Sequence, residues 1–330
     1  MGFRWLCAYL WPSTNGRVIV KRLQEELWMR PHWCAAMTYT VAHHAMCDPR
    51  TPFGSPLVVS PEHEVTMREV LKLLRELQLD HPGTSLPDLW AAAASYAVAH
   101  LGGPLMTMSW GRLEEEFPPD PIVVMAPKVS SLTDDVRTIK RTLGGRCELA
   151  ADEMVALLGH RTIGVHGGAH GARQVALMRE ASAEMIETNK FVVKEATPSD
   201  DEPGMGSSTP GVFDNDYFVS LEKDGWQPVV KTGGFFGLGG SGKRKAGNAG
   251  DALPEPPIDC DSPEDLRLHL SENAPCVGMQ PLDVTMRKDL MLLPWIQKFA
   301  ENEVRFFNAY GRAAGKVLRC GWEGWNLRDG

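Results

Sequence analysis

The chain has no apolar stretch long enough to cross a membrane, because no run approaches the roughly 18 residues that a spanning helix needs. It also lacks an excess of basic residues: 34 Lys and Arg stand against 42 Asp and Glu, and the net charge is −8. A general nucleic-acid binder needs a basic face. The acidic balance therefore argues against a nucleic-acid partner.

Paired cysteine motifs are missing too. None of the seven cysteines belongs to a Cys-x-x-Cys pair, and an odd, scattered set is not typical of a disulfide framework or a zinc site. We therefore expect mostly buried thiols in a reducing compartment. The cysteines are Cys7, Cys34, Cys47, Cys147, Cys260, Cys276 and Cys320.

What is present is ordinary for a globular protein. Hydrophobic residues make up 43% of the 330 residues and charged residues 23%, which is enough apolar material for a core. The length favours one large domain or two smaller ones. Residues 1–24 hold four basic side chains and no acid, so they are either a mitochondrial targeting segment or, given their Trp and Tyr content, a packed N-terminal segment.

Apolar residues recur at helical spacing along much of the chain, and strand signals are scarce, so we predict a mainly α fold. Residues 104–131 are rich in proline and should be extended. Residues 225–280, rich in glycine and proline, should form a long irregular insertion at the surface. We expect helices over residues 23–47, 62–79, 85–100, 132–144, 151–158, 173–190 and 284–318.

Two groups of residues imitate binding motifs. The glycine-rich stretch 237–244 resembles a phosphate-binding loop, but Arg244 stands where such a loop needs Ser or Thr, so we interpret it as a flexible basic linker and expect no nucleotide. His160, His166 and His170 lie around a glycine-rich turn without a nearby carboxylate or cysteine to complete a metal site. We therefore expect no metal there.

Five motifs occur in a fixed order along the chain. They are His81–Trp90 followed by Gly102-Gly103-Pro104, Trp110-Gly111-Arg112, Val155–Gly164, Phe213–Phe218, and Pro281-Leu282-Asp283 followed by Asp289, Phe306-Phe307 and Lys316.

These motifs and their order resemble the class I haem peroxidases, the group that holds cytochrome c peroxidase and ascorbate peroxidase. The resemblance covers residues 25–222 and 279–321. It implies a two-lobed, mostly helical fold with haem between a distal-type lobe, residues 25–150, and a proximal-type lobe, residues 151–330, which carries the insertion 225–280.

The distal motif is only partly kept. By the resemblance, His43 matches the base that takes a proton from peroxide. Tyr39 stands where the family has an Arg that stabilises charge as the O–O bond breaks, and a neutral phenol supplies one donor instead of five. Ala42 replaces the distal Trp, and Glu64 falls near the Asn that orients the distal His.

The proximal motif departs further. The iron-ligating His of the family aligns with Arg161, and a guanidinium stays protonated and only donates hydrogen bonds, so it cannot bind iron. His160 is a fallback ligand, but one step along an α-helix turns a side chain by about 100°. We therefore expect His160 to point away from the cleft unless the helix end is remodelled. Gly206 aligns with the proximal Trp, and His170 lies near the substrate-binding Arg of ascorbate-using members.

Asp283 matches the carboxylate that holds the proximal His in the family. With Arg161 in place of that His, the two side chains should face each other. We therefore predict an ion pair between Arg161 and Asp283 that fills the vacated proximal site.

Three functions remain. The leading hypothesis is a pseudoperoxidase without a cofactor, which acts through protein partners as a structural or interaction subunit of a larger mitochondrial assembly. If the protein is not mitochondrial, we expect it in the cytoplasm. The alternative is an active peroxidase that uses haem b to reduce hydrogen peroxide, with His160 as ligand and His43 as base. The third is a non-catalytic haem sensor with His43 as its only ligand.

Overall fold

The structure is a computed structural model, and it describes the segments of the chain that carry most of the motifs. Nothing is described of the remaining residues, which include 1–13, 164–203 and 229–268. The described residues are 14–30, 32–47, 52–54, 56–59, 63–106, 108–113, 121–124, 136, 140–145, 147–163, 204–205, 212–223, 226–228, 269–271, 277–279, 281–322 and 327–329.

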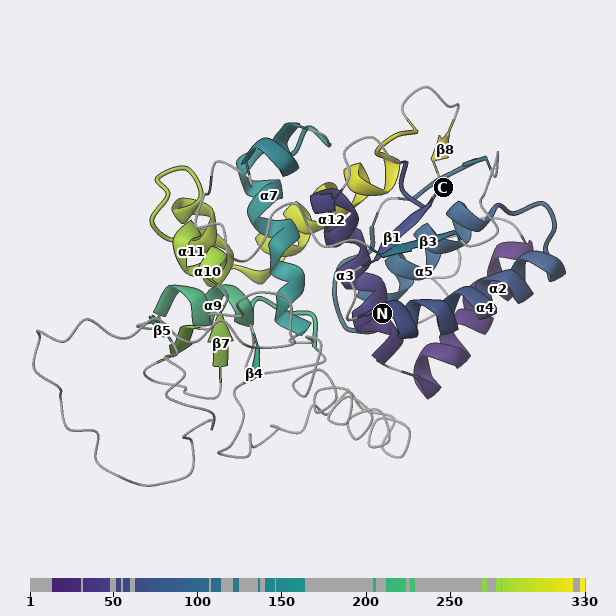
Figure 1. Cartoon of the computed structure of the whole chain (residues 1–330), viewed down its shortest axis with the longest axis horizontal. Coiled ribbons are helices and arrows are strands. Elements are labelled where there is room, and N and C mark those ends of the chain that lie inside the picture. Colours follow the sequence, from purple (N-terminus) through teal and green to yellow (C-terminus); the bar gives the residue numbers. More distant parts are fainter. Residues whose placement is uncertain are drawn as a thin grey trace, which may run out of the picture.

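Most of the described residues are helical, as predicted, and they form two groups of elements (Figure 1). The first group contains four helices and two pairs of short strands, β1 with β3 in parallel and β2 with β8 antiparallel. Its elements are α2 (Thr14–Met29), α3 (His32–Cys47), β1 (Leu57–Val59), α4 (Glu64–Asp80), α5 (Leu86–His100), β2 (Ser109–Trp110), β3 (Ile122–Val124) and β8 (Arg328–Asp329).

The second group combines helices with a four-stranded sheet in the order β4-β7-β6-β5. It contains α7 (Ala151–Leu158), the 3₁₀ helix η3 (Gly159–Ile163), β4 (Gly204–Met205), α9 (Asp216–Lys223), β5 (Trp226–Pro228), β6 (His269–Ser271), β7 (Val277–Met279), α10 (Pro281–Met286) and α11 (Leu293–Glu301). The π-helix η2 (Lys140–Gly144) precedes α7 in the chain.

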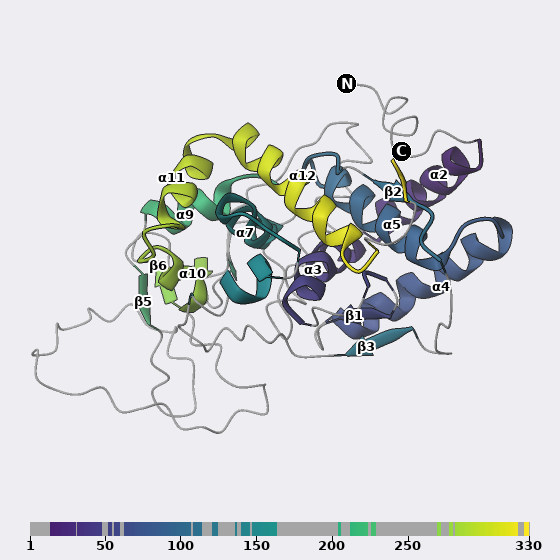
Figure 2. The same cartoon turned by 90° about the horizontal axis from the view of Figure 1, so that it is seen from above.

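Helix α12 (Glu303–Arg319) runs from the second group to the first in both views (Figures 1 and 2). Asn302 caps its start by accepting a hydrogen bond from the Arg305 amide. Its buried face repeats at helical spacing through Phe306, Tyr310, Ala313 and Val317. This helix packs against α7 and α11 in the second group and against α3 in the first.

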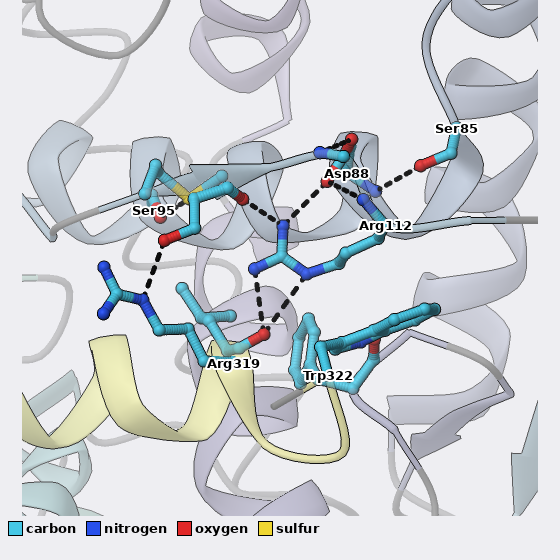
Figure 3. A network of polar contacts seen from close by, with 11 residues as sticks. Ser85, Asp88, Ser95, Arg112, Arg319 and Trp322 are labelled. Carbon is cyan, nitrogen blue, oxygen red and sulfur yellow. Dashed lines mark hydrogen bonds and ion pairs between the residues drawn. The ribbon is translucent and has the colours of Figure 1, made fainter. Parts of the chain in front are cut away.

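The end of α12 is fixed by a buried arginine (Figure 3). Arg112 donates from Nη1 to Asp88 Oδ1 at 2.7 Å, and from Nε and Nη2 to the Leu318 carbonyl at 3.2 and 2.9 Å. Arg319 donates to the Ser109 hydroxyl at 2.7 Å. The Trp110-Gly111-Arg112 motif thus joins the start of α5 to the end of α12.

The first predicted helix differs from the structure. The sequence predicts one helix over residues 23–47, whereas the structure has α2 ending at Met29 and α3 starting at His32. Arg30 is not helical, and the next residue in the sequence is Pro31. The residue before a proline is disfavoured in the α conformation, which explains the break.

Several other predictions fall on residues that the structure does not describe. They include the helix over 173–190, the stretch 237–244, and His166, His170 and Gly206. Most of the insertion 225–280 also lies outside the described residues, apart from β5, β6 and β7. Among the residues that are described, no helix is long and apolar enough to span a membrane.

Candidate functional site

The distal motif lies on α3, a helix inside the core. Ala42 is fully buried, and His43 is 5% exposed. The hydroxyls of Thr38 and Thr40 donate to the carbonyls one turn earlier, of Cys34 and Ala36, both at 2.8 Å. These bonds satisfy the hydroxyls of Thr38 and Thr40 within the helix, so both side chains can be buried.

Tyr39 on α3 contacts the segment that follows α7. The ring of Tyr39 meets the ring of His160 edge-on, with 4.4 Å between the centroids. It also lies 5.0 Å from the ring of His63, just before α4. Tyr39 therefore links the distal helix to both η3 and the start of α4.

The proximal segment starts at a glycine that must stay small. A Cβ at Gly159 would lie 2.6 Å from the Phe306 ring and 2.7 Å from the Phe218 ring. The chain therefore passes close to α12 and α9 here. From Gly159 to Ile163 the backbone winds as a 3₁₀ helix instead of continuing α7.

This winding brings His160 toward α3. The sequence predicts that His160 points away from the cleft unless the helix end is remodelled. In the structure α7 is followed by a 3₁₀ helix, and the His160 imidazole lies against Tyr39. His160 Nδ1 lies 2.8 Å from the Leu157 carbonyl. Burial, and after it the nearby Arg161, His63 and His43, lower the pKa of His160 to about 3. The ring is therefore neutral at pH 7.

Arg161 lies in a buried cluster with two residues from other elements. It donates from Nη1 to Asp283 Oδ1, and the Tyr217 hydroxyl donates to the same oxygen at 2.9 Å. Arg161 is 6% exposed and Asp283 is 1% exposed. The structure thus brings together the residues from η3 and α10 that the sequence placed face to face.

Charge balance in this cluster is set by opposing effects. Burial by itself lowers the pKa of Arg161, but Asp283, Tyr217 and Tyr39 outweigh it, and the pKa is raised. Burial and then Asp283 raise the pKa of Tyr217 well above its usual value. At pH 7 the cluster is a charged guanidinium beside a neutral phenol.

Haem bound in the family's manner does not fit these side chains as they stand. A planar ring between two groups needs about 3.5 Å on each side, or about 7 Å in all. The Tyr39 and His160 centroids are 4.4 Å apart, and Arg161, which the resemblance aligns with the iron ligand, is a cation paired with Asp283. Within the residues that the structure describes, no group of three His, Cys, Asp or Glu side chains could hold a metal ion.

The remaining predicted residues have other partners. Glu64 begins α4 and pairs with Arg68 at 2.9 Å on the same helix. Asp214 accepts hydrogen bonds from the Thr162 hydroxyl at 2.5 Å and from the Asp216 amide at 3.0 Å. It therefore ties η3 to the start of α9.

The sequence did not predict that His63 contacts Tyr39 or that Tyr217 donates to Asp283. Tyr217 stands in the Phe213–Phe218 motif, which carried information on fold but none on where the hydroxyl points. His63 lies next to a proline-rich loop with no periodic pattern. Only the packing of separate elements places these two side chains at the site.

The similarity of this chain to known proteins agrees with this architecture. The family model described as "Peroxidase" matches residues 27–302. This chain belongs to the peroxidase family, and its mainly helical structure is consistent with the haem peroxidase fold.

Two kinds of relatives are similar to the chain at low identity. Proteins named "Cytochrome c peroxidase, mitochondrial" from two strains of Cryptococcus neoformans var. neoformans serotype D are 24% identical over 281 residues, covering 81% of this chain and 56% of theirs. A protein of Mycosarcoma maydis named "Putative heme-binding peroxidase" is 23% identical over 252 residues, covering 75% of this chain and 58% of its own. The chain thus spans a little over half the length of these relatives.

Proposed function

We propose that this protein is a pseudoperoxidase: it keeps the fold of the family but neither ligates haem iron from the proximal side nor uses haem to cleave peroxide. The observation that carries the proposal is the buried pairing of Arg161 with Asp283, since the resemblance aligns Arg161 with the family's iron ligand. A guanidinium has no free lone pair, and a positive charge there repels the metal.

The distal side supports the same proposal. His43 alone would remain as a proton acceptor, because Tyr39 and Ala42 stand where the family has its Arg and Trp. Tyr39 lies against His160, which occupies part of the space between the lobes. Without a positive group aimed at the breaking O–O bond, the developing charge would lack its main stabilisation.

We further propose that the chain serves as a structural or interaction subunit of a larger mitochondrial assembly. Its units are a distal-type lobe, residues 25–150, and a proximal-type lobe, residues 151–330, with the segment 225–280 offering a surface for a protein partner. The mitochondrial label of the cytochrome c peroxidases and the basic segment 1–24 support this location.

The alternative function is an active haem peroxidase, and one observation favours it. The imidazole of His160 is neutral, and a hydrogen bond from Nδ1 to the Leu157 carbonyl leaves the lone pair on Nε2. The names of the relatives agree with this function. It requires Tyr39 and His160 to separate so that a porphyrin can lie between them.

A haem titration of the full-length protein tests the proposal. We expect no Soret band after incubation with haem and removal of the excess, and no peroxide reduction above free haem. A Soret band that co-purifies with the chain would overturn the proposal. His160→Ala and His43→Ala, with His81→Ala outside the cluster as control, then identify the ligand, and peroxide turnover separates the active enzyme from the sensor.

A further inference from the structure

Two cysteines that are far apart in the sequence meet in the interior. Cys147 lies just before α7, and Cys320 ends α12, 173 positions later. Their sulfur atoms are 2.8 Å apart, and their residues are 7% and 3% exposed. Since a disulfide has an S–S bond of about 2.05 Å, the sulfurs have less than about 1 Å to close.

The backbones on both sides of this contact are already held together. Lys316, one turn before Cys320, donates to the carbonyl of Glu148 at 3.1 Å and pairs with Glu153 at 2.7 Å. Cys320 itself accepts a hydrogen bond from the Phe53 amide through its carbonyl at 3.1 Å. Joining the sulfurs therefore requires no rearrangement of the elements that carry them.

We propose that Cys147 and Cys320 are a redox-active thiol pair that closes to a disulfide when the protein meets a peroxide. This modification site is independent of the proposed function, because it uses neither the Arg161 cluster nor haem. It covalently joins the end of α12 to the segment that leads into α7.

The reaction balances with one hydrogen peroxide for each pair. The thiolate of Cys147, the more exposed of the two, attacks the peroxide; the O–O bond breaks, a sulfenic acid forms, and the leaving hydroxide takes a proton to become water. The Cys320 sulfur then attacks the sulfenic sulfur, the S–S bond forms, and a second water leaves with the thiol proton. Two sulfurs are oxidised and one peroxide is reduced.

Cys34 provides an internal control. It is also buried, on α3, but no second cysteine sulfur is in contact with it among the described residues. Burial raises the pKa of its thiol, so the reactive thiolate is scarce.

The experiment exposes the reduced full-length protein to hydrogen peroxide, blocks the remaining thiols under denaturing conditions and maps the peptides by mass spectrometry. We expect a peptide joining Cys147 to Cys320, a loss of two thiols from the seven, and full reversal by dithiothreitol. The linked peptide should disappear in Cys147→Ser and Cys320→Ser and remain in Cys34→Ser.

The proposal fails if the wild-type protein yields Cys147 and Cys320 only as separate blocked or over-oxidised peptides. It also fails if disulfides form between other cysteines and the Cys147→Ser variant keeps the same pattern. The peptides from the wild-type protein show whether the Cys147–Cys320 disulfide forms, even where a serine variant folds poorly.

Discussion

At the residue scale, the cluster of Arg161, Asp283 and Tyr217 is a buried ion pair with a third polar partner. One carboxylate oxygen accepts hydrogen bonds from two different side chains. Each member is buried, so each depends on the others for its polar contacts. The net gain from such an ion pair is small, but removing one partner leaves the other charge stranded in the core.

Single substitutions in this pair should therefore be costly. We expect Arg161→Met or Asp283→Leu to lower the free energy of unfolding by about 3–5 kcal/mol, measured by urea denaturation. The double variant should lose much less than the sum, because neither charge is left without a partner. Equal and additive losses would contradict the buried pairing.

The pair Glu64 and Arg68 is the matched control. These side chains form an ion pair on α4 but are 35% and 41% exposed. Water and salt screen such a pair, so Arg68→Met should change stability by no more than about 0.5 kcal/mol.

At the element scale, the close approach of η3 to α12 and α9 depends on Gly159. Two phenylalanine rings, from Phe306 and Phe218, lie where a Cβ would point. A methyl group there forces the rings or the backbone to shift. Because η3 also carries His160 and Arg161, the same shift would move both site residues.

Gly159→Ala should destabilise the protein by about 1–3 kcal/mol, which thermal unfolding can measure. Gly83→Ala serves as the control, since a Cβ at Gly83 would meet nothing within 4 Å. If the two variants have the same melting temperature, the tight contact at Gly159 is not present in solution.

At the scale of the whole molecule, the buried His160 and the half-buried His100 link stability to pH. Burial lowers the pKa of His160 to about 3 and that of His100 to about 4, from 6.5. The unfolded chain takes up these protons below pH 6.5 and the folded chain does not. The stabilisation is therefore present above pH 6.5 and is lost as the pH falls toward 3.

We expect the free energy of unfolding to fall between pH 6 and 4 with a slope that His160→Gln reduces by about 1.4 kcal/mol per pH unit. Urea denaturation at several pH values measures this slope. His81→Gln, which alters a histidine outside the buried cluster, should leave the slope as in the wild type. An unchanged slope in His160→Gln would show that His160 is protonated in the folded protein.

The sequence predicted the helical class and many element positions because apolar spacing and capping residues are local signals. Ser85 before α5 and the periodic leucines of α4 are examples. The contact between Arg161 and Asp283 followed from the resemblance, since the motifs fixed both positions on a known fold.

Other features depend on long-range packing that no local pattern records. His160 faces Tyr39 because η3 is a 3₁₀ helix. At the start of η3, Gly159 packs against α12 and α9. The meeting of Cys147 with Cys320 joins segments 173 positions apart. Cysteine spacing alone could not reveal this pair.

The shared carboxylate of Asp283 has a consequence for how this chain could change over generations. An imidazole at position 161 could still donate to that oxygen, but it would leave the Tyr39–His160 contact in place. A substitution at position 161 alone would therefore not make room for a planar cofactor between the Tyr39 and His160 rings. Residues on both sides of that contact would have to change together with it.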